Sequence, residues 1–278
     1  MKAGAILVAQ ISDLHIKRPG QLAYRRVDTA AALSRCVDAL NRFAPRLDLV
    51  VISGDLADTP AAEEYAHLQT LLAPLQIPFV AIPGNHDDRA MLRAGFAQPY
   101  AQASGALNLA AKAGDLDILL LDSSVPGASH GQLDAGTLRW LADALAASPK
   151  RPALVFLHHP PFITGIGHMD VQNLRNAAEL ASVLRQHQRV LLVAAGHVHR
   201  AMLTNFAGMP ATICPAPNHA VALDLEAHLP PSFNVEPPAF HLHVWFPGDG
   251  YGQLVTHWVP IGDFDGPHPF FAKDGSLL

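Results

Sequence analysis

Short apolar runs alternate with amphipathic segments along most of the chain. Residues 5–11 form a mostly apolar run, and residues 25–43 follow with Leu33, Val37 and Leu40 at helical spacing. The alternation continues through apolar runs at residues 47–52, 77–82, 115–122, 153–157 and 190–195, and through helical spacing within residues 65–75, 138–145 and 174–184. Such periods indicate buried strands and amphipathic helices. Their order predicts an α/β fold in which helical crossovers join parallel strands.

The helical spacing fades after residue 200. Strand-like segments at residues 201–206, 209–214, 219–225, 239–246 and 252–259 are separated there by proline and glycine. We expect these segments to form a second sheet packed beside the first. Residues 226–238 contain two Pro-Pro pairs. We expect this excursion to be either a cap or a contact surface.

Composition and charge narrow the class of protein. Half of the 278 residues are apolar, enough for a full core, and the formal net charge is −5. No Lys or Arg run is present, so a nucleic-acid polymer is not an expected partner. No apolar stretch reaches transmembrane length, and the N-terminus is interpreted as a first strand rather than a signal peptide. We expect a cytoplasmic protein without a membrane partner, in which Cys36 and Cys214 are buried free thiols.

Polar islands rich in Asp, Asn and His follow five of the apolar runs. They are Asp13-Leu14-His15, Gly54-Asp55-Leu56-Ala57-Asp58, Gly84-Asn85-His86-Asp87, His158-His159-Pro160 and Gly196-His197-Val198-His199. Functional groups in open α/β sheets collect at the carboxyl ends of the strands. Carboxylate, amide and imidazole groups without a thiolate can hold two divalent ions close together. The islands therefore predict a two-metal site.

The first two islands supply carboxylates. Asp13 and His15 are two residues apart, so in an extended segment both side chains can bind one ion. A chance Asp-x-His in a loop is the alternative. Asp55 has two carboxylate oxygens and can bridge two ions, and Gly54 allows backbone and metal to approach closely. Asp58 either orients a histidine or caps a helix, and the sequence favours neither.

The third island separates a ligand from an acid–base group. The amide oxygen of Asn85 can bind a hard ion without adding negative charge. His86 is next to this ligand but points elsewhere, so it is free for acid–base work. Asp87 or Asp58 could fix the tautomer of His86. A simple Gly-Asn turn is the weaker alternative, given the neighbouring His and Asp residues.

The last two islands supply imidazoles. His158 is the first residue past its strand, and we assign it as a ligand, with His159 in a supporting or structural role. His197 and His199 flank one residue and could serve different ions. Neither would be stable unpaired in an apolar strand.

Together the islands resemble the calcineurin-like metallophosphoesterase superfamily over residues 5–225, and Gly84-Asn85-His86-Asp87 is the most diagnostic part. Within the superfamily, the chain is similar to the bacterial class III cyclic-nucleotide phosphodiesterase and glycerophosphodiesterase branch. That finer similarity lies in His159-Pro160-Pro161, in Met169-Asp170 with the residues that follow, and in residues 236–243.

The resemblance implies a four-layer αββα sandwich of two mixed sheets flanked by helices, with a small C-terminal cap or dimerisation excursion. It implies one ion bound by Asp13, His15, Asp55 and His199, and a second bound by Asp55, Asn85, His158 and His197. It also implies that Asn85, His86 and His219 contact the substrate, and that His86 assists the leaving group. A surface-loop histidine is the alternative for His219.

The predicted reaction is hydrolysis of a small-molecule phosphodiester, either a 3′,5′-cyclic nucleotide or a glycerophosphodiester, by a hydroxide that bridges two divalent ions. The ligand types suit Mn, Fe, Zn or Co. A phosphomonoesterase or nucleotidase on the same scaffold is the first alternative. A non-catalytic binding protein is the second, and it is disfavoured because every ligand position holds a suitable residue.

The domain organisation follows from these assignments. Residues 1–225 are the predicted catalytic domain. Residues 226–278 are expected to complete the same domain with C-terminal strands, a cap or oligomer contact, and a tail. We expect a homo-oligomer, a dimer or higher.

Overall fold

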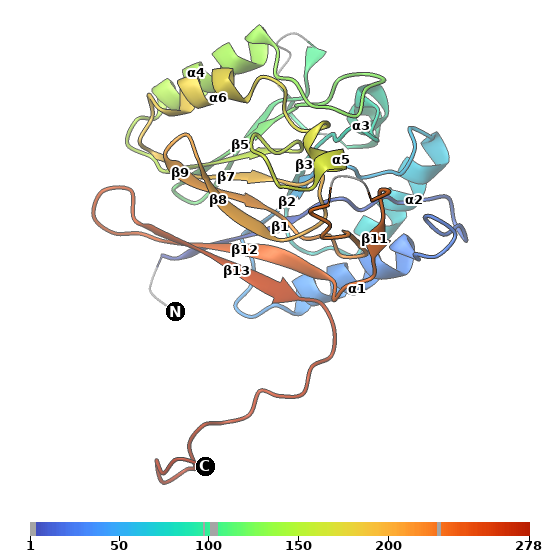
Figure 1. Cartoon of the computed structure of the whole chain (residues 1–278). Coiled ribbons are helices and arrows are strands. Elements are labelled where there is room, and N and C mark those ends of the chain that lie inside the picture. Colours follow the sequence, from blue (N-terminus) through green and yellow to red (C-terminus); the bar gives the residue numbers. More distant parts are fainter. Residues whose placement is uncertain (1–3, 97, 101–104, 227–228) are drawn as a thin grey trace.

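Two mixed β-sheets lie face to face in the computed structural model, and helices cover their outer faces (Figure 1). The structure describes residues 4–96, 98–100, 105–226 and 229–278. The first sheet has the order β13-β12-β1-β2-β3. Its strands are β1 (Ile6–Ile11), β2 (Leu49–Ser53), β3 (Phe79–Ile82), β12 (Ala239–Phe246) and β13 (Gln253–Pro260). The strands β1, β2 and β3 are parallel, and β12 and β13 are antiparallel to their neighbours.

The second sheet has the order β4-β5-β6-β7-β9-β8. Its strands are β4 (Leu109–Ala113), β5 (Leu116–Leu121), β6 (Ala153–Leu157), β7 (Val190–Ala195), β8 (Met202–Phe206) and β9 (Met209–Ile213). The four central strands are parallel, and the edge strands β4 and β8 run antiparallel to them. This arrangement confirms the predicted α/β class with two mixed sheets.

The alternation of side chains along β6 shows how the layers form. Leu154 and Phe156 pack in the core between the two sheets, whereas Val155 and Leu157 pack in the core beneath the outer helices. Successive side chains of a strand point to opposite faces, so a strand buried on both sides is apolar throughout. The helices are α1 (Thr29–Arg42), α2 (Ala62–Leu72), α3 (Arg89–Gly95), α4 (Ala135–Ala147), α5 (Gly167–Asp170) and α6 (Ala177–Leu184).

The strands after residue 200 correct one prediction. They do not form a sheet of their own: β8 and β9 extend the sheet of β5, β6 and β7, whereas β12 pairs with β1 and β13 follows it. The reason is that β1 and β7 each had an open edge that a later strand could complete. The predicted strand over residues 219–225 is also wrong in extent, because only β10 (Ala220–Val221) forms, paired with β11 (Phe233–Asn234) outside both sheets.

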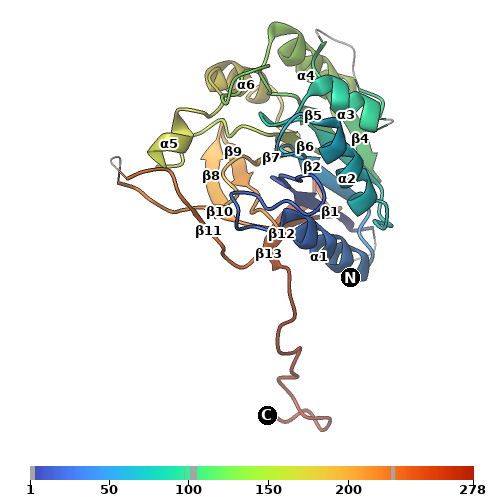
Figure 2. The ribbon, with the colours of Figure 1, turned by 90° about the vertical axis from the view of Figure 1, so that its right-hand side faces the viewer.

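The C-terminal tail leaves the body of the molecule after β13 (Figures 1 and 2). Ile261 is the last buried residue, and the side chains that follow are almost all exposed. Among the described helices, none has both the length and the hydrophobicity to cross a membrane.

Candidate metal centre

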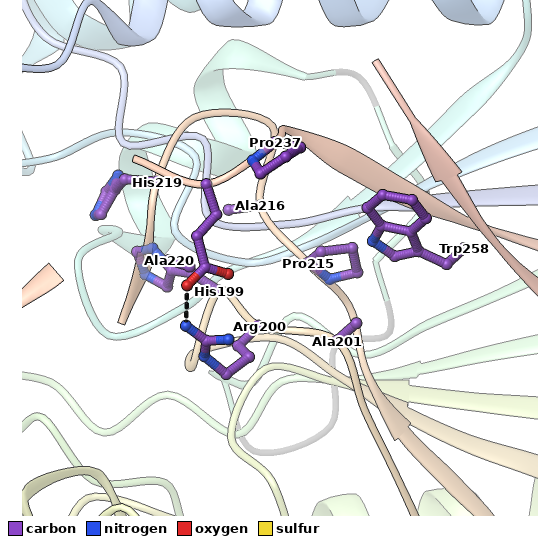
Figure 3. A pocket seen from close by; sticks show the side chains of 10 residues that line it. His199, Arg200, Ala201, Pro215, Ala216, His219, Ala220, Pro237 and Trp258 are labelled. Carbon is purple, nitrogen blue, oxygen red and sulfur yellow. Dashed lines mark hydrogen bonds and ion pairs between the residues drawn. The ribbon is translucent and has the colours of Figure 1, made fainter. Parts of the chain in front are cut away.

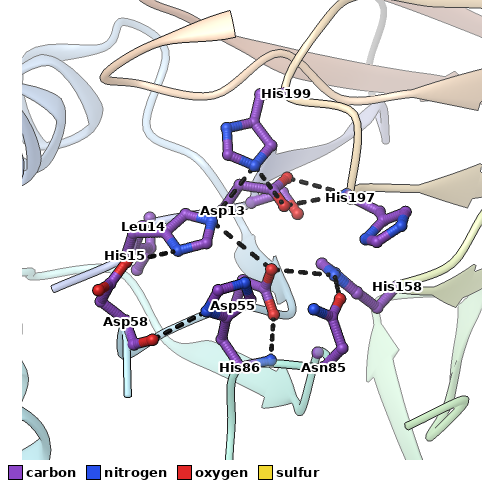
Figure 4. A network of polar contacts seen from close by, with 12 residues as sticks. Asp13, Leu14, His15, Asp55, Asp58, Asn85, His86, His158, His197 and His199 are labelled. Atoms are coloured by element: carbon purple, nitrogen blue, oxygen red, sulfur yellow. Dashed lines mark hydrogen bonds and ion pairs between the residues drawn. The ribbon is translucent and has the colours of Figure 1, made fainter. Parts of the chain in front are cut away.

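The five islands meet at one edge of the sandwich, where β1, β2, β3, β6 and β7 end (Figure 4). Backbone bonds join the first two islands: Asp13 N donates to Gly54 O and His15 N donates to Asp55 O, both at 3.0 Å. The carboxyl ends of strands from both sheets thus contribute to one cluster. The structure brings together all seven residues predicted as ligands.

The backbone of this cluster is unusual. Eight described residues other than glycine have a positive φ, and five of them are predicted ligands. These five are Asp13 (59°), His15 (45°), Asp55 (51°), His197 (73°) and His199 (56°). The left-handed region is sterically costly for residues with a Cβ, and such residues concentrate at functional sites.

One group of ligand atoms surrounds the Nε2 atoms of two histidines. His15 Nε2 lies 3.2 Å from His199 Nε2 and 3.5 Å from Asp55 Oδ2. His199 Nε2 also lies 3.4 Å from Asp13 Oδ1. Donor atoms that share an ion at about 2.0–2.2 Å lie roughly 3.0–3.5 Å from one another. The spacing therefore fits a single bound cation.

A second group lies on the other side of Asp55. His158 Nε2 is 3.3 Å from Asp55 Oδ2 and 3.2 Å from Asn85 Oδ1. His197 adds a buried Nε2 that forms no hydrogen bond within the described part of the chain. An orphaned buried nitrogen beside this group needs a partner, and a metal ion would be one. Asp55 Oδ2 faces both groups, whereas its Oδ1 accepts a bond from His86 N at 2.9 Å.

Neighbouring oxygen atoms orient two of the four ligand histidines. His15 Nδ1 is 3.2 Å from Asp58 Oδ1, and His158 Nδ1 is 2.9 Å from the carbonyl oxygen of Ser53. Each acceptor favours a proton on Nδ1 and leaves Nε2 free for an ion. The geometry favours the orienting role for Asp58 over the helix cap, because α2 starts after Ala61 without a side-chain cap.

His86 lies at the rim of the cluster. Its Nδ1 is 2.8 Å from the backbone oxygen of Asp58, an obligate acceptor, so Nδ1 carries the proton. The carboxylate of Asp87 does not set this tautomer, contrary to one of the two predicted options. Asp87 instead accepts bonds from Leu56 N, Ala57 N, Gly84 N and Tyr65 Oη, which hold the loop in place.

Burial and mutual charge shape the titration of the cluster in the absence of ions. Burial raises the pKa of Asp55, but His158 and His86 more than reverse this and hold the pKa well below its usual range. Burial, partly offset by His158, raises the pKa of Asp13 to about 6. Burial together with His158 lowers the pKa of His197 to about 3. His197 is thus neutral at pH 7, which is the form that binds metals.

Glycines allow the islands to pack. A Cβ on Gly84 would overlap Asp55 Oδ1, and a Cβ on Gly196 would overlap Ser12 Oγ. Gly54 has a φ of 104° and lies against the ring of His158. The close approach of backbone predicted for Gly54 is present, since the Gly84 backbone and the His158 ring both lie against it. The approach of a metal ion stays a prediction.

His219 and two aromatic residues border the cluster. The ring of His219 lies 4.5 Å from that of His199 and 5.8 Å from that of His15. Tyr24 and Phe233, at 5.3 Å and 5.4 Å from the His219 ring, were not identified from the sequence. Their segments carry no periodicity or motif that would distinguish them. Burial, then the carboxylates of Asp58, Asp55 and Asp13, raise the pKa of Tyr24 to about 12.

A small pocket separate from the ligand cluster is lined in part by His199 and His219 (Figure 3). Its volume is about 130 Å³, and an ion pair between Arg200 and Glu236 lines it. Arg200 Nε also donates to Val221 O at 3.0 Å. This ion pair links the segment that follows His199 to the excursion over residues 226–238.

Comparison with known proteins identifies relatives of the whole chain. The model of the family described as calcineurin-like phosphoesterase matches residues 6–201. A probable glycerophosphodiester phosphodiesterase GpdQ from Arcobacter nitrofigilis is 40% identical over 98% of this chain and 100% of its own length. The 3′,5′-cyclic adenosine monophosphate phosphodiesterase CpdA of Escherichia coli K12 is 32% identical over 70% of each chain. A dimetal phosphatase from Danio rerio shares the fold, with a TM-score of 0.61 and 17% identity, covering 92% of this chain and 99% of its own.

Proposed function

The chain belongs to the calcineurin-like phosphoesterase family, and from this membership and the geometry of the site we propose that it hydrolyses small-molecule phosphodiesters. Enzymes of this family are hydrolases that use a dinuclear divalent metal centre. The observation that carries the proposal is the position of Asp55 Oδ2, which lies within 3.5 Å of a histidine nitrogen in each ligand group.

Asp13, His15, Asp55 and His199 would hold one ion, and Asp55, Asn85, His158 and His197 would hold the other. The nitrogen and oxygen ligands suit Mn, Fe, Zn or Co. When bound, the ions would supply Lewis acidity, which makes water more acidic and draws charge from phosphate oxygens. Two carboxylates cannot cancel the charge of two divalent ions, so the loaded site attracts an anion.

The chain itself supplies proton transfer. The Nδ1 proton of His86 is committed to the carbonyl of Asp58, so Nε2 is the atom that remains for the substrate. A protonated His86 would donate from Nε2 to the oxygen of the departing alcohol. Such donors contribute about 10²–10⁴-fold in rate. We propose that Asn85 and His219 contact the phosphate or its esters from either side.

The nearby arginines favour a diester over a monoester. Arg89 pairs with Asp122 at 2.6 Å and donates to Ser124 O at 2.8 Å. Arg200 pairs with Glu236. Neither guanidinium therefore offers an uncompensated charge to the dianion of a monoester. A phosphomonoesterase or nucleotidase remains the alternative that the experiment below must separate.

Replacement of His86 tests the assigned role. We expect His86→Ala to keep its metal content, because no ligand atom is removed, and to lower kcat on bis-p-nitrophenyl phosphate by about 10²–10⁴-fold. Metal content is measured by mass spectrometry of the purified protein. The exposed His257 provides a matched control, His257→Ala. Loss of metal from the His86 variant would show that His86 is a ligand. Faster turnover of p-nitrophenyl phosphate than of bis-p-nitrophenyl phosphate by the wild type would favour the monoesterase.

The natural substrate, a 3′,5′-cyclic nucleotide or a glycerophosphodiester, stays a prediction. A cytoplasmic location and the boundary of the catalytic domain at residue 225 are also predictions. We also propose a homo-oligomer, a dimer or higher. Exposed apolar side chains in the excursion and tail support it, namely Leu229, Val235, Phe270 and Phe271. No nucleic-acid polymer or membrane partner is proposed.

A further inference from the structure

Two recesses border the ligand cluster on opposite sides. The polar recess adjoins Asn85 and His86, and the aromatic recess adjoins His197, His199 and His219; each has a volume of about 390 Å³. In Figure 4, Asn85 and His86 lie at one edge of the cluster and His199 at the opposite edge. An acyclic diester has two separate arms on one phosphorus atom. A phosphate placed over Asp55 could therefore direct one arm into each recess.

Three rings form one wall of the aromatic recess. Tyr24 lies 5.0 Å from Phe233 and 5.3 Å from His219, and His219 lies 5.4 Å from Phe233. Offset and edge-to-face contacts at these spacings are favourable. The rings come from three separate segments of the chain, so this wall forms only when the chain folds.

The backbone conformation of Tyr24 is energetically unfavourable. Its φ is 50° and that of Arg25 is 58°, in a tight loop closed by two 2.9 Å bonds between Ala23 and Val27. The residue is nevertheless 53% exposed, and its ring packs against His219 and Phe233 rather than in the hydrophobic core. Strain at an exposed aromatic residue beside a ligand cluster indicates a role in binding.

We propose, on the basis of the phosphodiesterase function above, that the aromatic recess binds the ester arm that stays on phosphorus and selects a planar, largely apolar arm. The other arm lies in the polar recess beside His86. A water oxygen joins phosphorus and releases a proton to solvent as the P–O bond to that arm breaks. The departing oxygen takes a proton from His86, which regains one from solvent. The products are a monoester with the planar arm and a free alcohol.

The linings of the recesses support this division. No Asp, Glu, Lys or Arg is among the described residues that line the aromatic recess, where Met169, Val221 and Phe233 contribute apolar surface. The polar recess contains Asp58, Asp88 and Arg89. A hydroxyl-bearing arm finds charged partners in the polar recess, whereas the aromatic recess offers only uncharged polar groups such as Gln172 and Ser232 beside its apolar surface. A cavity of about 150 Å³ holds a benzene molecule, so the aromatic recess has room for a larger ring.

Two diesters with the same leaving group test the proposal. Bis-p-nitrophenyl phosphate retains an aryl arm after cleavage, whereas methyl p-nitrophenyl phosphate retains a methyl group. For Phe233→Ala and Tyr24→Ala in the Mn-loaded enzyme, we expect kcat/KM for the aryl diester to fall about tenfold. We expect the methyl diester to change less than about twofold, because it places nothing against the rings. The kcat/KM of each variant is divided by that of the wild type on the same diester, so the different intrinsic reactivity of the two diesters cancels.

Further variants separate binding from folding. Tyr24→Phe keeps the ring and should keep the wild-type preference, and Phe270→Ala in the exposed tail should change neither diester. Equal losses on both diesters, or no loss on either, would overturn the proposal and leave the phosphodiesterase function intact. If the metal-loaded wild type hydrolyses neither diester, the proposed function itself fails.

Discussion

Asp55 Oδ2 lies 3.5 Å from His15 Nε2 and 3.3 Å from His158 Nε2, so a single oxygen faces both ligand groups. Asp55→Asn keeps the size of the side chain but removes its charge. We expect this variant to lose both ions, because each group loses an anionic ligand. Asp13→Asn should chiefly empty the group of His15 and His199. Metal-to-protein ratios and calorimetric titration with Mn²⁺ measure the difference.

The exposed Asp38 on α1 provides the control, because Asp38→Asn removes the same charge far from the islands. Two ions retained by Asp55→Asn with full turnover would refute the bridging role. Loss of both ions from Asp13→Asn would show instead that the two groups cannot be filled separately.

His158 makes the stability of the metal-free protein depend on pH. Burial lowers the pKa of His158, but Asp55 and Asp13 outweigh it and raise the pKa to about 9. Because the folded chain binds this proton more tightly, the contribution to stability is complete below about pH 6.5 and is lost as pH rises through about 9. His15, whose pKa is also raised, acts in the same direction.

We therefore expect the melting temperature of chelator-treated protein to fall between pH 6.5 and about 8.5. The Mn-loaded protein should not show this fall, because ions displace these protons and bind more tightly as pH rises. Melting curves of both forms at constant ionic strength give the comparison. A metal-free protein that gains stability over this range would contradict the assigned protonation of His158.

At the level of the elements, the strand ends depend on glycine for close packing. A Cβ on Gly84 would overlap Asp55 N and Oδ1. We expect Gly84→Ala to displace Asp55, to reduce metal content and turnover, and to lower the free energy of unfolding by about 1–3 kcal/mol. Denaturant titration and metal analysis measure these effects. Gly248→Ala is the control, since its Cβ would meet no atom closer than 3.9 Å.

The elements with strong periodicity could be predicted from the sequence, and short elements could not. The strand β6 occupies residues 153–157 as predicted, because its apolar run is buried on both faces. The helix α1 begins at Thr29, not at residue 25, because Asp28 caps it by accepting a bond from Ala31 N. The helix α3 buries only Leu92 and so leaves almost no apolar pattern in the sequence.

The residues of the candidate site that belong to motifs could be predicted from the sequence, and the others could not. The seven proposed ligands belong to motifs at strand ends, and parallel strands bring such ends together. Tyr24 and Phe233 carry no such signal, because they meet only through the loop at Tyr24 and the pairing of β10 with β11. The partners of the strands after residue 200 also depended on which sheet edges were open, and local sequence does not encode that.

For the molecule as a whole, the tail is separable from the site. Residues 262–278 contribute no side chain to the ligand cluster or to either recess. We expect a chain that ends at Gly262 to keep kcat/KM within about twofold and to fold normally, as is usual for exposed termini. If Phe270 and Phe271 mediate self-association, light scattering should show a lower molecular mass for this chain.

The 278-residue chain in the same buffer is the reference for the truncated chain. An unchanged mass would assign the oligomer contact to another surface, or show that there is none. A large loss of turnover would mean that the tail reaches the site in solution, against its exposed position in the structure.

The pairing of β1 with β12 has a consequence for synthesis on the ribosome. Ile6 pairs with Trp245 and Gln10 with His241, so one edge of this early strand stays unpaired until the much later residues 239–246 have been synthesised. Until residue 246 has emerged, the nascent polypeptide carries an apolar strand with an unpaired edge, which is a template for aggregation. Prematurely terminated products should therefore be insoluble clients of chaperones and proteases.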